Sequence, residues 1–172
     1  MHHQHPRARV GVIATAWPDD WEARREGASC PMCADLGAPR KPGGVRIFEG
    51  HWSDAYLGRW PLRRGYAYVI WKGRHVAEPT ELSAEAATGF WDEVLTVARA
   101  IERRYAPCKM NYLLLGNGVP HLHVHLVPRH ADDPRAGGPI ESDAFKRARE
   151  HPLEDAELEA EARELRRLLG GG

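Results

Sequence analysis

The sequence is poor in cysteine, has no excess of either charge and contains no long hydrophobic run. Three cysteines in 172 residues are too few for a disulfide framework. Basic and acidic residues both number 24, so the chain lacks the positive excess expected of a protein that coats a nucleic acid. No apolar stretch approaches the roughly 20 residues that cross a bilayer, and the first residues do not resemble a signal peptide. We therefore expect a cytoplasmic protein with no nucleic-acid polymer and no membrane among its partners.

The length and the 42% hydrophobic content suit one globular domain with a substantial core. We divide the chain into a variable N-terminal extension over 1–29, a central domain over 30–130, and a linker with C-terminal helices over 131–172. The extension has no sustained apolar period, and we expect it to pack through Trp17 and Trp21. Its histidines at positions 2, 3 and 5 fit a solvated terminus better than a metal site.

Three histidines alternate with apolar residues over 120–128, which read Pro-His-Leu-His-Val-His-Leu-Val-Pro. A period of two is typical of a β-strand, in which every second side chain lies on the same face. His121, His123 and His125 should therefore line one surface while the intervening apolar side chains enter a core. Chance clusters of histidine usually fall in solvated loops or tags, and the apolar residues here argue against that reading. This face is the first candidate site.

The remaining pattern predicts a mixture of strands and helices. Apolar residues at intervals of three and four predict a long helix from Thr80 to Tyr105, capped by Thr80 or Ser83 and ended by Pro107. Strands are expected at 45–49, 51–57, 66–71 and 110–116, with a tight loop over 117–120 leading into the histidine strand. Two further helices are expected at 143–150 and 155–169, and the second is amphipathic.

The pair Cys30 and Cys33 encloses Pro31-Met32, a spacing used both by zinc sites and by redox centres. A redox centre of the thioredoxin type requires the motif at the start of a helix. Residues 34–39 do not predict a helix of useful length. Metal binding is therefore the better interpretation of the pair.

These motifs together resemble the histidine triad family. The run His-Leu-His-Val-His-Leu-Val matches the family signature, and the pair Cys30 and Cys33 and the later His75 stand where zinc-containing members carry metal ligands. The resemblance implies an α+β fold with an antiparallel sheet of about five strands, one long helix packed across it, and C-terminal helices. It also implies a possible homodimer, since members often pair through the long helix and the sheet edge. Gly-Asn-x-x-Pro-His over 116–121 is similar to the turn of bacterial members regarded as dinucleoside polyphosphate hydrolases.

The resemblance also implies a chemistry: hydrolysis or transfer at the α-phosphate of a nucleotide through a covalent nucleotidyl-histidine. His123 would be the nucleophile, which requires one free ring nitrogen and one held by an acceptor. His125 would stabilise the phosphoryl oxygens or aid the leaving group. The side chain of Asn117 and the backbone of Gly118 would contact phosphate. The alternative is a nucleotide-binding or zinc-binding scaffold with little turnover.

The same resemblance assigns a structural Zn²⁺ to Cys30, Cys33, His75 and His121. Four protein ligands would close the site, so the ion would fix the histidine strand and would not activate water. The alternative is reduced cysteines with His75 facing solvent.

Two positions depart from the family pattern. Gly118 stands where a serine or threonine is usual, and Arg59 stands where many members carry an acidic residue or asparagine that binds ribose. Arg59, Arg63 or Arg64 could meet a distal phosphate or sulfate, although arginines in a loop are more often solvated. Asn111, another possible substrate contact, could instead cap its strand.

Overall fold

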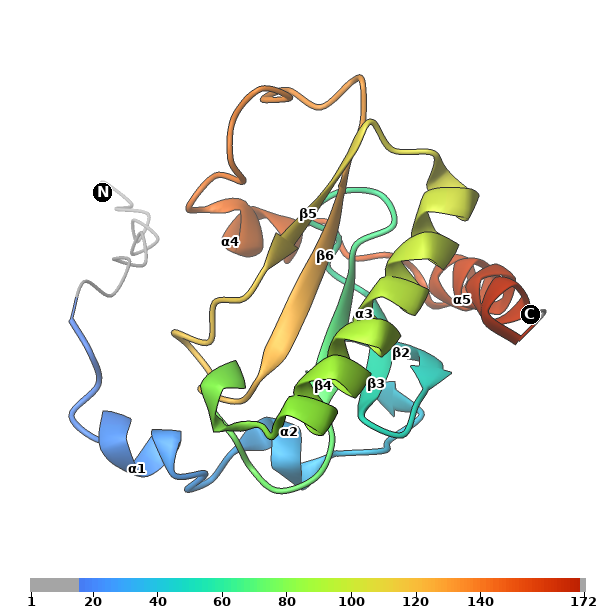
Figure 1. The fold of residues 1–172 in the computed structure, drawn as a ribbon. Coiled ribbons are helices and arrows are strands. Elements are labelled where there is room, and N and C mark those ends of the chain that lie inside the picture. Colours follow the sequence, from blue (N-terminus) through green and yellow to red (C-terminus); the bar gives the residue numbers. More distant parts are fainter. Residues whose placement is uncertain (1–15, 171–172) are drawn as a thin grey trace, which may run out of the picture.

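The computed structural model describes residues 16–170, and the histidines at positions 2, 3 and 5 lie outside this range. Its centre is an antiparallel sheet of six strands in the order β1-β2-β3-β4-β6-β5 (Figure 1). The strands are β1 (Arg40–Lys41), β2 (Gly44–Glu49), β3 (Ser53–Gly58), β4 (Ala67–Trp71), β5 (Lys109–Leu113) and β6 (His123–Arg129). The α+β architecture is confirmed. The sixth strand, β1, is only two residues long and leaves no period in the sequence.

The helices of the described chain are α1 (Trp21–Arg25), α2 (Pro31–Ala34), α3 (Ala84–Tyr105), α4 (Ala144–Ala148) and α5 (Asp155–Gly170), with a short 3-10 helix at Pro79–Glu81. The long helix α3 begins at the predicted cap, where the Ser83 hydroxyl accepts from the amide of Ala86 at 3.2 Å. It ends before Ala106, whose φ of 45° is left-handed and breaks the helical geometry.

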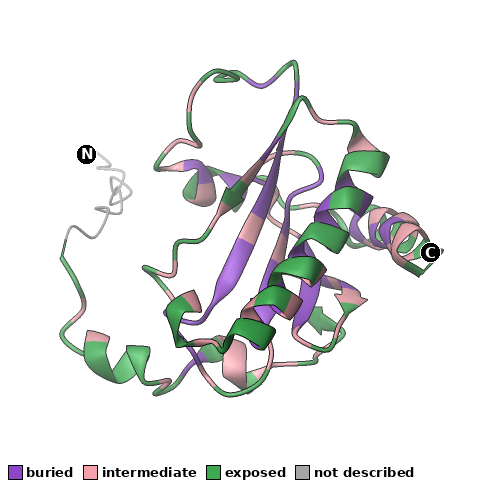
Figure 2. Ribbon diagram, in the orientation of Figure 1, coloured by how far each residue is buried: buried purple, intermediate pink, exposed green. Residues whose placement is uncertain are grey.

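Helices α3 and α5 cover one face of the sheet and form the main core (Figures 1 and 2). The buried stripe of α3 includes Phe90, Val94 and Ile101, and the predicted amphipathic face of α5 contributes Leu158 and Leu165. The sheet meets them with the alternate apolar side chains of its central strands, Ala55, Leu57, Val69, Val124 and Leu126. Each central strand therefore presents its other set of side chains to the opposite face.

The opposite face carries the histidines. His123 is paired with Ile70 and His125 with Tyr68 across β4 and β6, and paired residues in an antiparallel sheet point to the same side. The short helix α4 lies over this face and buries Ala144 and Ala148 in a second, smaller core with Leu62, Tyr66 and Val127. The two faces thus differ in character: one is filled by long helices, and the other is only partly covered.

The segment between β5 and β6 departs from the prediction. The expected tight loop over 117–120 is a longer connection over 114–122, and β6 begins at His123. His121 therefore precedes the strand that holds the other two histidines, although it is fully buried. This position lets its ring serve a different site.

Strand β5 forms one edge of the sheet and leaves large apolar side chains exposed. Tyr112, Leu114 and Leu115 belong to this edge and its continuation, and Leu115 is 50% exposed. Between residues 16 and 170, no helix combines the length and the apolar character needed to cross a membrane.

Candidate active site and metal centre

His123 and His125 meet on the open face of the sheet, where their Nε2 atoms lie 3.1 Å apart. The other nitrogen of His123, Nδ1, lies 2.6 Å from the carbonyl oxygen of His121. The other nitrogen of His125 lies 2.8 Å from the hydroxyl of Tyr66, a residue that precedes β4. Every ring nitrogen of this pair therefore has a partner.

These contacts determine which nitrogens carry protons. A carbonyl oxygen only accepts, so Nδ1 of His123 must donate and Nε2 of a neutral His123 keeps its lone pair. Nε2 of His125 then donates to that lone pair, and Nδ1 of His125 accepts from the Tyr66 hydroxyl. The arrangement makes Nε2 of His123 the unprotonated nitrogen that lines the pocket, and it can act as a nucleophile once the donor on His125 turns to another acceptor.

Burial keeps both rings neutral. Desolvation lowers the pKa of His123, and desolvation with a smaller contribution from neighbouring His123 lowers the pKa of His125 to about 3. Burial raises the pKa of Tyr66, so its hydroxyl keeps the proton that it donates. At neutral pH the pair is thus uncharged, as a nucleophilic imidazole must be.

A pocket of about 410 Å³ opens onto the two histidines, and we call it the catalytic pocket. Its walls are largely aromatic, with Trp60, Tyr66, Tyr68 and Phe145 around His123 and His125. The ring of Phe145 packs edge-on to His125, with centroids 5.1 Å apart. The polar groups of the lining include the ion pair Lys41–Asp35, at 2.7 Å, and Arg149. A volume of this size with flat apolar walls and a few polar groups suits a small ligand with an aromatic ring.

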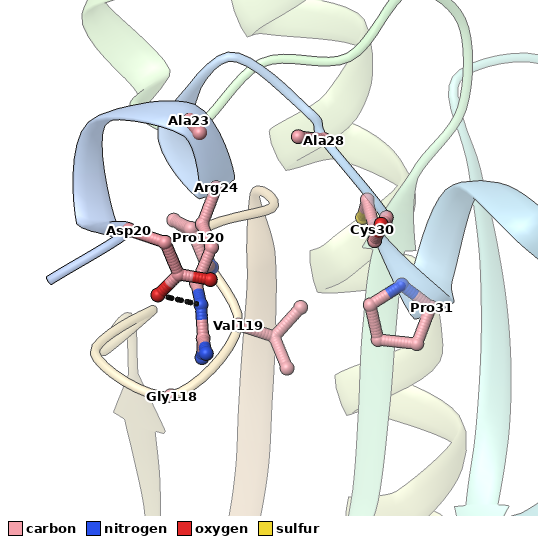
Figure 3. Close-up of a pocket in the computed structure, with 10 residues that line it drawn as sticks. Asp20, Ala23, Arg24, Ala28, Cys30, Pro31, Gly118, Val119 and Pro120 are labelled. Carbon is pink, nitrogen blue, oxygen red and sulfur yellow. Dashed lines mark ion pairs between the residues drawn. The ribbon is translucent and has the colours of Figure 1, made fainter. Parts of the chain in front are cut away.

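A second hollow of about 340 Å³ lies beside the catalytic pocket and shares Pro31 and Val119 with it (Figure 3). Helix α1 forms one side, where Arg24 and Asp20 are joined by an ion pair of 2.9 Å. Gly118 belongs to the other side. His123 and His125 line the catalytic pocket and not this hollow.

Four potential metal ligands converge next to the triad, as the resemblance implied. Ligand atoms of Cys30, Cys33, His75 and His121 all lie within 4.8 Å of one another. Three separations between Sγ and Nδ1 measure 3.3 to 3.5 Å. A tetrahedral Zn²⁺, with bonds of about 2.3 Å to sulfur and about 2.0 Å to nitrogen, places such atoms about 3.5 Å apart. The residues present therefore fit a zinc ion with two thiolates and two imidazoles.

The outer contacts of the two imidazoles support the same conclusion. Nε2 of His75 lies 3.0 Å from the carbonyl oxygen of Arg25, and Nε2 of His121 lies 3.0 Å from that of Trp71. Both rings must donate there, which leaves each Nδ1 lone pair facing the sulfur atoms. Desolvation, with the adjacent Cys30, raises the pKa of the Cys33 thiol to about 11. Two negatively charged thiolates this close together are therefore unfavourable unless a cation balances their charge.

Glycine makes one of these contacts possible. Gly27 has a φ of +96°, and a Cβ atom at this position would lie 2.9 Å from the ring of His75. The chain can therefore approach the ring closely enough for Arg25 to accept its proton. The extension over 16–29 is in this way attached to the metal centre, while Trp17 and Trp21 pack on each other, with centroids 4.5 Å apart.

The predicted substrate contacts are not gathered in the catalytic pocket. Asn117 is exposed, and Gly118 lines the neighbouring hollow. Asn111 accepts from Arg129 at 2.7 Å. Arg59 donates to the Leu153 carbonyl at 3.3 Å and pairs with Asp155, so it connects the end of β3 to the start of α5.

Sequence reasoning missed the residues that form the walls of the pocket. Tyr66 was assigned only to a strand, and its hydroxyl is the partner that orients His125. Trp60, Phe145 and Arg149 had no predicted role, and the last two come from α4 and its C-cap. A polar segment with one short helix carries no periodic signal, so no pattern in the sequence places it over the histidines.

The model of the HIT domain matches residues 45–132, which include His75 and the three triad histidines. The chain belongs to the HIT domain family. This family comprises nucleotide-binding hydrolases and transferases. The chain is also similar to the "Protein hit" of Bacillus subtilis, with 29% identity over 91 residues. That match covers 50% of this chain and 62% of the relative, less than two thirds of its length.

Solved structures share the fold of this HIT domain protein. A Zn-bound histidine triad family protein from Mycobacterium smegmatis has a TM-score of 0.60 at 24% identity, over 83% of this chain and 94% of that one. A hypothetical histidine triad nucleotide-binding protein from Sulfolobus tokodaii has a TM-score of 0.63 at 20% identity, over 83% and 93%. A histidine triad protein from Bradyrhizobium japonicum has a TM-score of 0.62 at 22% identity, over 78% and 96%.

Proposed function

We propose that this HIT domain protein is a nucleotidyl hydrolase or transferase that forms a covalent nucleotidyl-histidine at His123. The observation that carries the proposal is the unprotonated Nε2 of His123 on the lining of the pocket, because Nδ1 donates to the His121 carbonyl and Nε2 is left as the acceptor from His125. Nε2 forms a bond to the α-phosphorus while the bond from phosphorus to the leaving group breaks. The electron pair leaves with the oxygen of a phosphate or sulfate, or with the nitrogen of a phosphoramidate, which takes up a proton from solvent.

His125 acts as a hydrogen-bond donor in this reaction. Its Nε2–H, which meets His123 in the free protein, turns to a phosphoryl oxygen of the substrate. In the second step, water or another acceptor attacks phosphorus, loses its proton to solvent, and the P–N pair returns to Nε2. A phosphate or sulfate leaving group departs as an anion and needs no proton from the site, which suits the neutral histidine pair.

A zinc ion held by Cys30, Cys33, His75 and His121 would be structural. When bound, it supplies a fixed position for His121. The carbonyl oxygen of His121 accepts from Nδ1 of His123 at 2.6 Å, so the metal centre and the nucleophile are joined through one residue. The role of these side chains is therefore to orient His123.

The test is a panel of nucleotides incubated with the purified protein: dinucleoside polyphosphates, nucleoside phosphoramidates and adenylyl sulfate. Mass spectrometry of products and of the intact protein should detect a released nucleotide and a nucleotidyl adduct on His123. Saturable nucleotide binding with neither product nor adduct would instead support the scaffold function.

The hydroxyl of Tyr66 should matter for rate more than for binding. We expect Tyr66→Phe to lower kcat by about tenfold with little change in KM, because the ring still packs on His125 but no longer donates to its Nδ1. Tyr68→Phe is the matched control, since Tyr68 lines the same pocket without a hydrogen bond to either histidine. Equal effects of the two variants would contradict this role.

We further propose that the protein is a homodimer that pairs at the exposed edge of β5. An unpaired edge strand followed by Leu114 and Leu115 is a surface that soluble chains usually cover. We expect Leu115→Lys to convert a dimer to a monomer in light scattering after size exclusion. Trp17→Lys removes a more exposed apolar side chain that is part of neither β5 nor its continuation, and it should leave the dimer intact. A monomeric wild-type protein would refute the proposal.

A further inference from the structure

Arg149 lines the catalytic pocket, whereas the arginines that the sequence suggested for a phosphate, Arg59, Arg63 and Arg64, do not. It follows α4 directly, and its guanidinium carbon lies 4.8 Å from the centroid of the Trp60 ring, on the lining of the catalytic pocket. Stacking on a ring positions the guanidinium group without using its hydrogen-bond donors. Within the described range 16–170, Arg149 forms no ion pair, whereas Arg147 of α4 pairs with Asp143 and Glu141. Its donors are therefore free for a ligand.

Among the described residues, Arg149 is the basic side chain of the pocket whose charge is not balanced by a carboxylate partner. Lys41 is neutralised by Asp35 at 2.7 Å and lies over the ring of Tyr56. Asp35, Lys41 and Arg149 are the acidic, lysine and arginine side chains that line the pocket in the described part of the chain, and among them Arg149 is left with an unbalanced positive charge. A phosphate chain bound at His123 carries several negative charges that need a counter-ion.

The segment that carries Arg149 is firmly attached to the domain. Asp133 accepts from Arg129 at 2.6 Å and from Arg63 at 2.7 Å, and Arg63 also pairs with Glu141 at 3.1 Å. The carboxylate of Asp133 is fully buried, and the hydrogen bond from Arg63, followed by that from Arg129, holds its pKa well below its usual range. The linker before α4 is therefore fixed at both ends, so the helix presents Arg149 in a defined place.

The distance from α4 to the histidines is short. Phe145 contacts His125, and Arg149 follows it by four residues, one helical turn further along the same side. His123 and Arg149 line the same pocket, so a phosphate adjoining the α-phosphate at His123 would lie in the pocket that this turn borders. The segment that carries Phe145 and Arg149 lies beyond residue 132, where the match to the HIT domain ends.

We infer that Arg149 is a specificity-determining residue that binds the phosphate groups beyond the α-phosphate, so that the pocket selects nucleoside di- and polyphosphates over monophosphates. The inference rests on the proposed function, since it takes His123 as the place of the α-phosphate. A leaving group that departs as an anion gains from a guanidinium partner in the bound state and as its charge increases.

The experiment is isothermal titration of the wild-type protein, Arg149→Gln and Arg149→Lys with the mono-, di- and triphosphates of adenosine and guanosine. We expect the wild type to bind the di- and triphosphates about tenfold more tightly than the monophosphate, as one charged hydrogen-bonding group allows. Arg149→Gln should remove this preference, and Arg149→Lys should retain part of it. Lys146→Gln removes a positive charge from an exposed position on α4 and should leave the preference unchanged.

The ratio of the affinities for polyphosphates and monophosphates separates loss of phosphate recognition from a folding defect, because a loosened α4 would weaken the binding of all the nucleotides together. A preference that survives in Arg149→Gln, or a wild type with no preference or no binding, would overturn the inference. Chromatography of the nucleotides recovered from the same samples reports turnover separately. A preference lost in Arg149→Gln supports the role of Arg149 even without turnover by the wild type, whereas the enzymatic proposal fails separately if the wild type turns over no member of the wider nucleotide panel.

Discussion

Replacement of His123 by alanine is expected to abolish nucleotide turnover and the covalent adduct. The neighbouring imidazole cannot replace it, because Nδ1 of His125 accepts from the Tyr66 hydroxyl and its Nε2 carries a proton. Loss of a nucleophile that acts as part of a unit lowers kcat by at least about ten-thousand-fold in comparable enzymes. Single-turnover kinetics with mass spectrometry of the intact protein would measure both effects.

The control must separate chemistry from folding, since His123 is only 6% exposed. His123→Gln keeps a polar side chain of similar length at the same place, and both variants should unfold close to the wild-type temperature. His51→Ala removes an exposed histidine in the turn between β2 and β3 and should leave kcat unchanged. Turnover by a folded His123→Ala protein at the wild-type rate on every nucleotide would eliminate the covalent mechanism.

Local patterns were sufficient for the elements that carry the histidines. The period of two over 120–128 predicted both the strand and the face of His123 and His125, because side-chain alternation is a property of the extended backbone itself. The period of α3 and its Ser83 cap were equally local. The position of His121 was less predictable, since it precedes β6 and its ring joins the metal ligands.

The walls of the pocket depend on contacts between distant parts of the chain, and these leave no local pattern. Arg63 was a candidate for phosphate, but it binds Asp133, 70 residues away, and so attaches the linker before α4. Arg59 likewise pairs with Asp155 at the start of α5. The arginine in the pocket comes instead from a segment whose composition indicated only a polar linker and a short helix. Which of several arginines meets a ligand is decided by their carboxylate partners, and those are known only after folding.

Substitution of Cys30 by serine is expected to release zinc and to destabilise the fold. Cys30 is buried, and its Sγ atom lies 3.5 Å from Nδ1 of His121. A hydroxyl is a poor ligand for zinc, and the three remaining groups cannot close a tetrahedral site. We expect a loss of about 3 kcal/mol or more in the free energy of unfolding. Structural zinc contributes roughly 10 kcal/mol in small peptides, but here a large hydrophobic core remains without it.

Cys108→Ser is the matched control, since Cys108 is exposed and distant from the cluster in sequence and in its contacts. Metal analysis of protein purified without added zinc should find one ion per chain in the wild type and in Cys108→Ser, and less in Cys30→Ser. The midpoint temperature of thermal unfolding should follow the same order, and a chelator should lower the midpoint of the wild type toward that of Cys30→Ser.

Activity should depend on zinc as well. Because the His121 carbonyl accepts from His123 at 2.6 Å, the zinc-depleted protein should lose activity that added zinc restores. A wild type free of zinc, or a Cys30→Ser variant as stable as Cys108→Ser, would show that these four side chains hold His121 in place by their own packing.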